Sequence, residues 1–303
     1  AALERGQDAP AVARARVLRH LASSPVNQGD SEAALRYAEQ SLALARSAGD
    51  VALLAEILYV TGYICSSLQA LDRAQPLLEE SLLLLEQSNQ RVTRQSVLDA
   101  LGYLLLSQGN YAGAVGYYTQ LVELARQAGD THALGRALNG LGELARVQGA
   151  YVNAERYFDA SLQQIQQAGS RGAETSVLPN LAHVLLHQGN VVQALATFRR
   201  GLTLAHEMSD KQAALQCLTG YAQVALATRH FELAAQLAGA AEHLLATNGL
   251  FLERTDRIDF DGTLALLQSQ RGQPPIADAW AAGEAMTLAE AISRALALPA
   301  EPM

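Results

Sequence analysis

An alanine recurs every 40 residues along this chain, without a single insertion or deletion. It stands at six successive positions: Ala34, Ala74, Ala114, Ala154, Ala194 and Ala234. A fixed period of this length is typical of repeat arrays, in which each unit stacks on its neighbours and the stack buries one continuous core. We therefore expect a repeat array rather than a compact enzyme.

Other columns of the sequence keep the same register. A small residue that allows close helix approach recurs as Ala22, Gly62, Gly102, Gly142, Ala182 and Ala222. Four residues after the alanine column stand Ala38, Leu78, Tyr118, Phe158, Phe198 and Ala238, followed three residues later by Ser41, Ser81, Leu121, Ser161, Gly201 and Ala241. A turn column reads Gly29, Gln69, Gly109, Gly149, Gly189 and Arg229. Spacings of three and four predict helical faces.

Each unit is expected to contain two antiparallel helices. In the best-formed unit, the sequence predicts helices over residues 131–147 and 151–167, each ended by a glycine. The pairs Gly49-Asp50, Gly129-Asp130 and Gly169-Ser170 combine a left-handed C-cap with a side chain able to cap the next helix. No repeat shows the alternation of a strand, so the fold class is all-α.

These columns resemble the tetratricopeptide (TPR) pattern. The residues that carry the resemblance are Leu141, Gly142, Ala145, Gly149, Tyr151, Ala154, Phe158 and Ser161, and the same columns recur over residues 15–249. The resemblance implies a TPR-like right-handed superhelical solenoid of about six helix-turn-helix repeats. The repeat is longer than the usual ~34 residues. HEAT repeats share the 40-residue period, but the alanine, aromatic and serine columns favour the TPR.

Arrays with 40-residue repeats resemble the C-terminal sensor regions of bacterial multidomain signalling ATPases and transcription activators, including relatives of the maltose-regulon activator. The segment from Asp278 to Ile292 is similar to the tail of such arrays. Within it, Thr287 and Glu290 predict a capping box. We expect repeats over residues 1–249 and a C-terminal helical cap over 250–303, formed by 251–270 and 276–298.

The composition narrows the partners. The net charge of -8 and the pI of 5.4 argue against direct binding of nucleic acid, because phosphate binding depends on Lys and Arg. No apolar stretch is long enough to predict a membrane span. The chain starts at Ala1 without a signal-type segment, so we expect a cytoplasmic fragment of a longer protein. Cys65 and Cys217 are expected to be buried thiols.

No catalytic motif stands out, so the sequence predicts neither an enzyme nor a cofactor. The chain has no phosphate-binding loop of the Gly-x-x-x-x-Gly-Lys type. The run from Asp256 to Gly262 resembles a calcium loop, but Arg257 and Gln268 occupy ligand positions. We therefore interpret it as a solvated helix start.

His183 and His187 are the sharpest chemical candidates. Their spacing of four places both imidazoles on one face of a helix, where they could contact a metal ion or a peptide. Two ligands do not complete a metal site, so none is predicted. An ordinary polar surface is the alternative.

The inner face of the superhelix is the predicted binding surface. By resemblance to the TPR family, its groove is lined by Tyr59, Tyr63, Asp99, Tyr103, Asn139, Glu143, Asn180, His183, His187 and Gln223. This mixture of aromatic and amide groups suits a peptide or protein segment. Alternatively, Tyr63 and Tyr103 only pack one repeat against the next.

The function expected is therefore protein interaction or ligand sensing. The partner would be a peptide, a protein, or an ATPase domain upstream in the same parent chain, and the array would bias its effector by a population shift. The alternative is a passive assembly scaffold without a small ligand.

Overall fold

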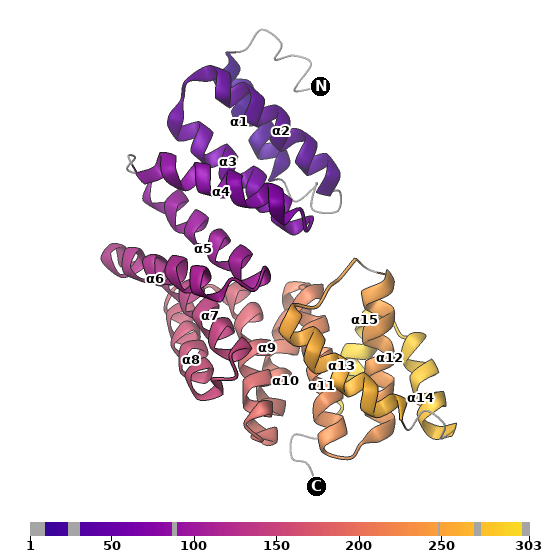
Figure 1. The fold of residues 1–303 in the computed structure, drawn as a ribbon. Helices are drawn as coiled ribbons and strands as arrows, with labels where there is room; N and C mark the ends of the chain where they lie inside the picture. Colours follow the sequence, from indigo (N-terminus) through magenta and orange to yellow (C-terminus); the bar gives the residue numbers. More distant parts are fainter. Residues whose placement is uncertain (1–9, 24–30, 87–89, 248, 270–273, 299–303) are drawn as a thin grey trace. The chain divides into compact units, whose positions relative to one another are not determined.

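Fifteen α-helices make up the part of the chain that the computed structural model describes, residues 10–23, 31–86, 90–247, 249–269 and 274–298 (Figure 1). The first six are α1 Ala11–Ala22, α2 Ser31–Ala48, α3 Val51–Ser67, α4 Leu71–Glu86, α5 Arg91–Ser107 and α6 Tyr111–Ala128. The next six are α7 Thr131–Val147, α8 Tyr151–Gln167, α9 Arg171–His187, α10 Val191–Met208, α11 Lys211–Ala227 and α12 Phe231–Thr247. Three more follow: α13 Arg254–Gln268, α14 Pro274–Glu284 and α15 Leu288–Leu296. No strand occurs in these ranges, so the prediction of an all-α fold is confirmed.

Contacts divide the chain into two compact units, residues 1–133 and 134–303. In each unit successive helices pack as antiparallel pairs, and first helices touch first helices, as α3 touches α1 and α5 and as α9 touches α11. The boundary predicted at residue 249 is a different one, because it separates the repeats from the C-terminal helices. It stays a prediction. Among the described residues, no helix combines the length and apolarity needed to cross a bilayer.

The alanine column lies at the contact within each helix pair. All six alanines are buried, five of them completely. The neighbouring small column explains why the pairs pack so closely: a Cβ added at Gly142 would lie 2.5 Å from the Phe158 ring, and one at Gly62 would lie 2.8 Å from Leu78. The small column and the column of Leu78 and Phe158 therefore fit each other across the helix pair.

The serine column adds a hydrogen bond that the spacing did not reveal. The hydroxyl groups of Ser41, Ser81 and Ser161 are buried and each donates to a backbone carbonyl 26 residues earlier, at 2.7 Å. Because a buried hydroxyl without a partner is costly, this repeated bond fixes the register of one helix against another.

The turns follow the predicted chemistry with one exception. Gly49, Gly129 and Gly169 have positive φ angles, and the Asp50 and Asp130 side chains accept hydrogen bonds from the next helix at 3.0 and 2.9 Å. Ser170 makes no side-chain cap, so that part of the prediction was wrong. Gly29 lies outside the described residues.

Two positions in the turn column hold residues that pay a conformational penalty. Gln69 and Arg229 adopt φ angles of 59° and 63°, in the left-handed region that disfavours a Cβ. We expect Gln69→Gly to raise the free energy of unfolding by about 0.5 to 1 kcal/mol, the left-handed strain less the greater entropy of an unfolded glycine. Urea denaturation measures this, and Gly149→Gln, at a φ of 72°, should show the opposite sign.

The C-terminal helices have two different roles. Helix α14 packs on α12, and α15 packs on α10, α11 and α12, so these two lie against the last helices of the array. That residues 250–303 act as its cap stays a prediction. The Thr287–Glu290 capping box is present at the start of α15. Helix α13 instead contacts α11 and α12 and lies against the first helices of the second unit.

Both cysteines are free and buried, as the sequence predicts. Burial raises the pKa of the Cys217 thiol well above its usual value, which makes it a poor nucleophile.

Candidate functional site

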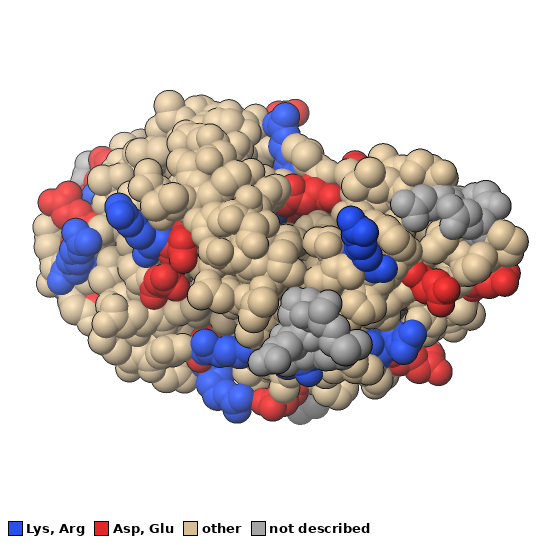
Figure 2. Space-filling model, turned by 90° about the horizontal axis from the view of Figure 1, so that it is seen from below, with Lys and Arg blue, Asp and Glu red and all other residues tan. Residues whose placement is uncertain are grey.

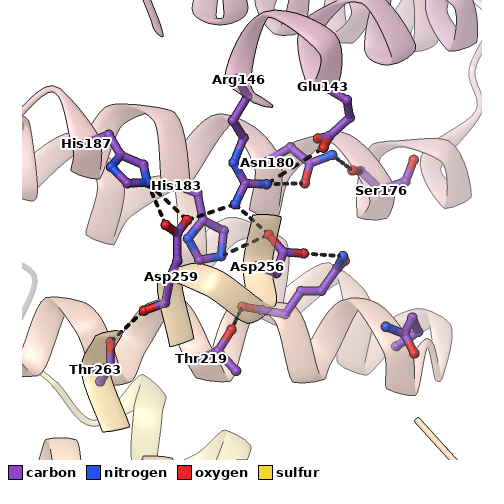
Figure 3. A network of polar contacts seen from close by, with 12 residues as sticks. Glu143, Arg146, Ser176, Asn180, His183, His187, Thr219, Asp256, Asp259 and Thr263 are labelled. Carbon is purple, nitrogen blue, oxygen red and sulfur yellow. Dashed lines mark hydrogen bonds and ion pairs between the residues drawn. The ribbon is translucent and has the colours of Figure 1, made fainter. Parts of the chain in front are cut away.

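A polar surface on the first helices of the second unit faces helix α13 (Figure 3). In chain order its side chains are Glu143 and Arg146 of α7, Asn180, His183 and His187 of α9, and Gln216 of α11. We call this set the α13-binding face. Successive repeats supply it because the first helices stack side by side, so equivalent columns of neighbouring repeats lie next to each other.

Arg146 is the centre of the face. Its Nη2 atom donates to Asp256 Oδ1 at 2.6 Å and to Asp259 Oδ2 at 3.1 Å, and its Nη1 atom donates to Asn180 Oδ1 at 3.4 Å. Gln216 donates from Nε2 to the second oxygen of Asp256 at 3.0 Å. Arg146 and Asp256 are almost completely buried. This is a buried ion pair that joins α7, α9 and α11 to α13.

The two histidines have different surroundings. His183 is fully buried, its ring meets Phe198 edge to face at 4.9 Å, and its Nε2 lies 3.9 Å from Asp256 Oδ1. His187 is partly exposed, stacks on the Tyr151 ring at 4.6 Å and lies 3.0 Å from Asp259. Only His187 is therefore within hydrogen-bond distance of a carboxylate.

Electrostatics favour charged aspartates at this site. Burial alone would raise the pKa of Asp256, but the Arg146 charge and hydrogen bonds from Arg146 and Gln216 hold that pKa below its usual value. Burial would also raise the pKa of Asp259, but the His187 hydrogen bond and the Arg146 charge hold that pKa below its usual value. Burial lowers the pKa of His183 to about 4, so its imidazole is neutral near pH 7.

The structure corrects our interpretation of the segment from Asp256 to Gly262. We expected a solvated helix start, but Asp256 is buried and paired with Arg146. Sequence reasoning also missed Arg146. A signal was available: its column elsewhere holds Val26, Ser66, Leu106, Leu186 and Leu226, so a charge at this position is out of pattern. Among the described residues, no group of three or more His, Cys, Asp or Glu side chains could hold a metal ion.

The predicted groove residues fall into two groups. Glu143, Asn180, His183 and His187 come together on the α13-binding face, while Asn139 and Gln223 lie partly buried on α7 and α11. Tyr59 and Tyr63 of α3 and Asp99 and Tyr103 of α5 belong to the other unit. There Tyr63 and Tyr103 are 56% and 38% exposed, and the Tyr59 and Tyr63 rings lie 6.3 Å apart. That any of these residues binds a partner stays a prediction.

The repeat columns and helix pairs have a counterpart in a family model. The model of the MalT-like TPR region matches residues 55–286, most of the chain. The chain belongs to this family. A model of anaphase-promoting complex subunit 5 matches residues 15–67. No curated protein matches the chain.

Solved structures share the fold of this MalT-like TPR region at low sequence identity. A Rap protein complexed with competence and sporulation factor is 16% identical, with a TM-score of 0.65, over 89% of this chain and 76% of that one. The STAND protein with a tetratricopeptide repeat sensor, PH0952 from Pyrococcus horikoshii, is 17% identical, with a TM-score of 0.62. The match covers 92% of this chain and 43% of that one. BtubC (BKLC) from P. vanneervenii is 18% identical, with a TM-score of 0.58, over 74% and 94%.

Glu143 gives this MalT-like TPR region a distinctive pH dependence. Burial raises the pKa of its carboxyl to about 7, although Arg146 opposes the shift. Between the usual value of 4.5 and about 7, the folded chain holds a proton that the unfolded chain has lost, so stability falls as the pH rises. Glu143→Gln should therefore raise the free energy of unfolding by about 2 kcal/mol at pH 8 and by less at pH 5.

His183 has the opposite effect, because the pKa of its imidazole is 6.5 in the unfolded chain and about 4 in the folded chain. Its contribution makes stability rise with pH over that window, and removing Glu143 should expose this rise. Urea unfolding from pH 5 to 8 measures both effects. The control is Glu80→Gln, at an exposed pair with Arg46. Parallel curves for the parent and Glu143→Gln would contradict the prediction.

Proposed function

We propose that this chain is a protein-interaction and ligand-sensing module that binds a peptide or protein segment on the polar face of its first helices. The observation that carries the proposal is that this face, in the second unit, already holds a polypeptide segment, because Arg146, His187 and Gln216 bind the carboxylates of α13. In the first unit the same face carries the exposed Tyr63 and Tyr103. Tyrosine is a frequent anchor at protein interfaces.

The surface chemistry and the relatives support a protein partner. On the side drawn in Figure 2, acidic and basic side chains are interspersed among uncharged residues, rather than gathered into a basic band. One similar structure is a Rap protein with a bound factor, and another is a STAND protein with a tetratricopeptide sensor. We accordingly propose a non-enzymatic, cytoplasmic sensor in a bacterial regulator of transcription or signalling, with an ATPase domain of the same parent chain as a further partner and no direct contact to nucleic acid.

A library of phage-displayed 12-residue peptides tests the face of the first unit. Peptides selected on the parent chain should bind the Tyr63→Ala/Tyr103→Ala variant at least tenfold more weakly in fluorescence anisotropy, because the variant loses aromatic contact area. The matched control is Val152→Ala/Val192→Ala, which alters exposed residues on the second helices α8 and α10.

Equal affinity of the parent and the tyrosine variant would contradict the proposed face. A chain that selects no peptide and instead self-associates with concentration in sedimentation velocity would be the passive scaffold.

A further inference from the structure

Helix α13 presents one acidic and apolar stripe to the face beneath it. Asp256 and Asp259 are three residues apart and share a side of the helix. The same stripe continues with the buried Phe260, Leu264 and Leu267. In sequence terms the stripe is Asp-x-x-Asp-Phe-x-x-x-Leu-x-x-Leu, a pattern that any amphipathic helix could supply.

The face that receives this stripe is built for carboxylates. Arg146, Gln216 and His187 reach the two aspartates from three successive repeats, at 2.6 to 3.1 Å. A buried guanidinium requires an anionic partner, because its desolvation is otherwise uncompensated. His183 is fully buried against Asp256, and neither of its ring nitrogens has a hydrogen-bond partner in the described structure. The face therefore selects for an acidic segment.

Only one side of α13 is engaged. Outside this stripe Ile258 and Leu266 are 62% and 58% exposed, and no neighbouring atom lies within 4 Å of a Cβ added at Gly262. Helix α13 thus packs through one side, against α11 and α12 as well as the polar residues of α7 and α9, as a bound ligand helix would lie in a groove.

We propose that the α13-binding face is a receptor for an acidic amphipathic helix of a partner protein, and that α13 is its internal occupant, which the partner helix replaces. The proposal rests on the proposed function, since it uses the same first-helix columns, and it adds the class of ligand. A partner helix binds with an affinity reduced by the fraction of chains in which α13 has left the face.

A labelled peptide of residues 253–269 tests the replacement. In the chain carrying Asp256→Asn/Asp259→Asn, the internal helix loses its charge while its shape is kept, so the fluorescein-labelled peptide should bind this chain at least tenfold more tightly than it binds the parent. A peptide with both aspartates changed to asparagine should bind the Asp256→Asn/Asp259→Asn chain at least tenfold more weakly than the acidic peptide does. Adding Arg146→Met to the chain should abolish the preference for the acidic peptide.

Hydrogen exchange on the unaltered chain provides a second measurement that does not depend on a variant's folding. An excess of the unlabelled peptide should speed amide exchange in α13 at least tenfold and leave α3 and α5 unchanged. Equal binding of the acidic and asparagine peptides, or no binding together with unchanged α13 exchange, would overturn the proposal. Either result leaves the Tyr63 and Tyr103 experiment untouched, because that experiment reports on the other unit.

Discussion

Replacing Arg146 with methionine is expected to lower the free energy of unfolding by about 3 to 5 kcal/mol. Methionine keeps much of the length of the side chain but leaves Asp256 buried without its cation, and Asp259 with only His187. A buried carboxylate without a partner is far costlier than a missing surface pair. Urea denaturation followed by circular dichroism measures the loss.

Two further variants show whether the loss comes from burial. Arg73→Met removes the pair with Glu39 at 2.6 Å, but both side chains are about half exposed, so the loss of stability should be much smaller than at Arg146. Combining Arg146→Met with Asp256→Leu replaces the buried pair by apolar groups and should recover most of the lost stability. Equal effects at Arg146 and Arg73 would show that the Arg146 pair is not desolvated.

The helix pairs were predictable because their packing repeats. Equivalent positions meet in successive units, as Gly62 meets Leu78 and Gly142 meets Phe158, so the sequence shows the same type of contact several times. Local rules were also sufficient at the capping box of Thr287 and at most turns. The predicted helix over 131–147 matches α7, and that over 151–167 matches α8.

The position of α13 was not predictable from the same reasoning. Its anchor joins Arg146 to Asp256, 110 residues apart, and this contact occurs once rather than in each repeat. Periodicity carries no information about such a contact, and an Asp near a helix start is by default solvated. The residues of the face were predicted in part. Glu143, Asn180, His183 and His187 were named, while Arg146, Gln216 and the acidic segment that they bind were missed. An out-of-pattern charge in an otherwise apolar or small column is the signal that would have led to it.

A second large effect is expected at the crossing of α12 and α14, where Gly283→Ala should cost about 3 kcal/mol or more. A Cβ at this position would lie 2.0 Å from the Gln236 carbonyl oxygen and 3.0 Å from the Ala240 nitrogen. Both neighbours are backbone atoms, so no side-chain rotation can relieve the overlap, and the two helices must separate. Thermal and urea unfolding measure the loss of stability.

Gly239→Ala, on α12 at the same crossing, should also lower stability, since a Cβ at Gly239 would lie 2.6 Å from the Trp280 carbonyl oxygen. Gly262→Ala is the matched control, because Gly262 is also helical but has open space around it. There the better helix propensity of alanine should raise stability by about 0.5 to 1 kcal/mol. If both alanine variants were stabilising, the two helices would not be in backbone contact. A loss of stability at Gly283 together with a gain at Gly262 would instead show that the cost arises at the helix crossing. Trp280 is buried in the parent, so a red shift of its fluorescence in Gly283→Ala would report that α14 had moved away from α12.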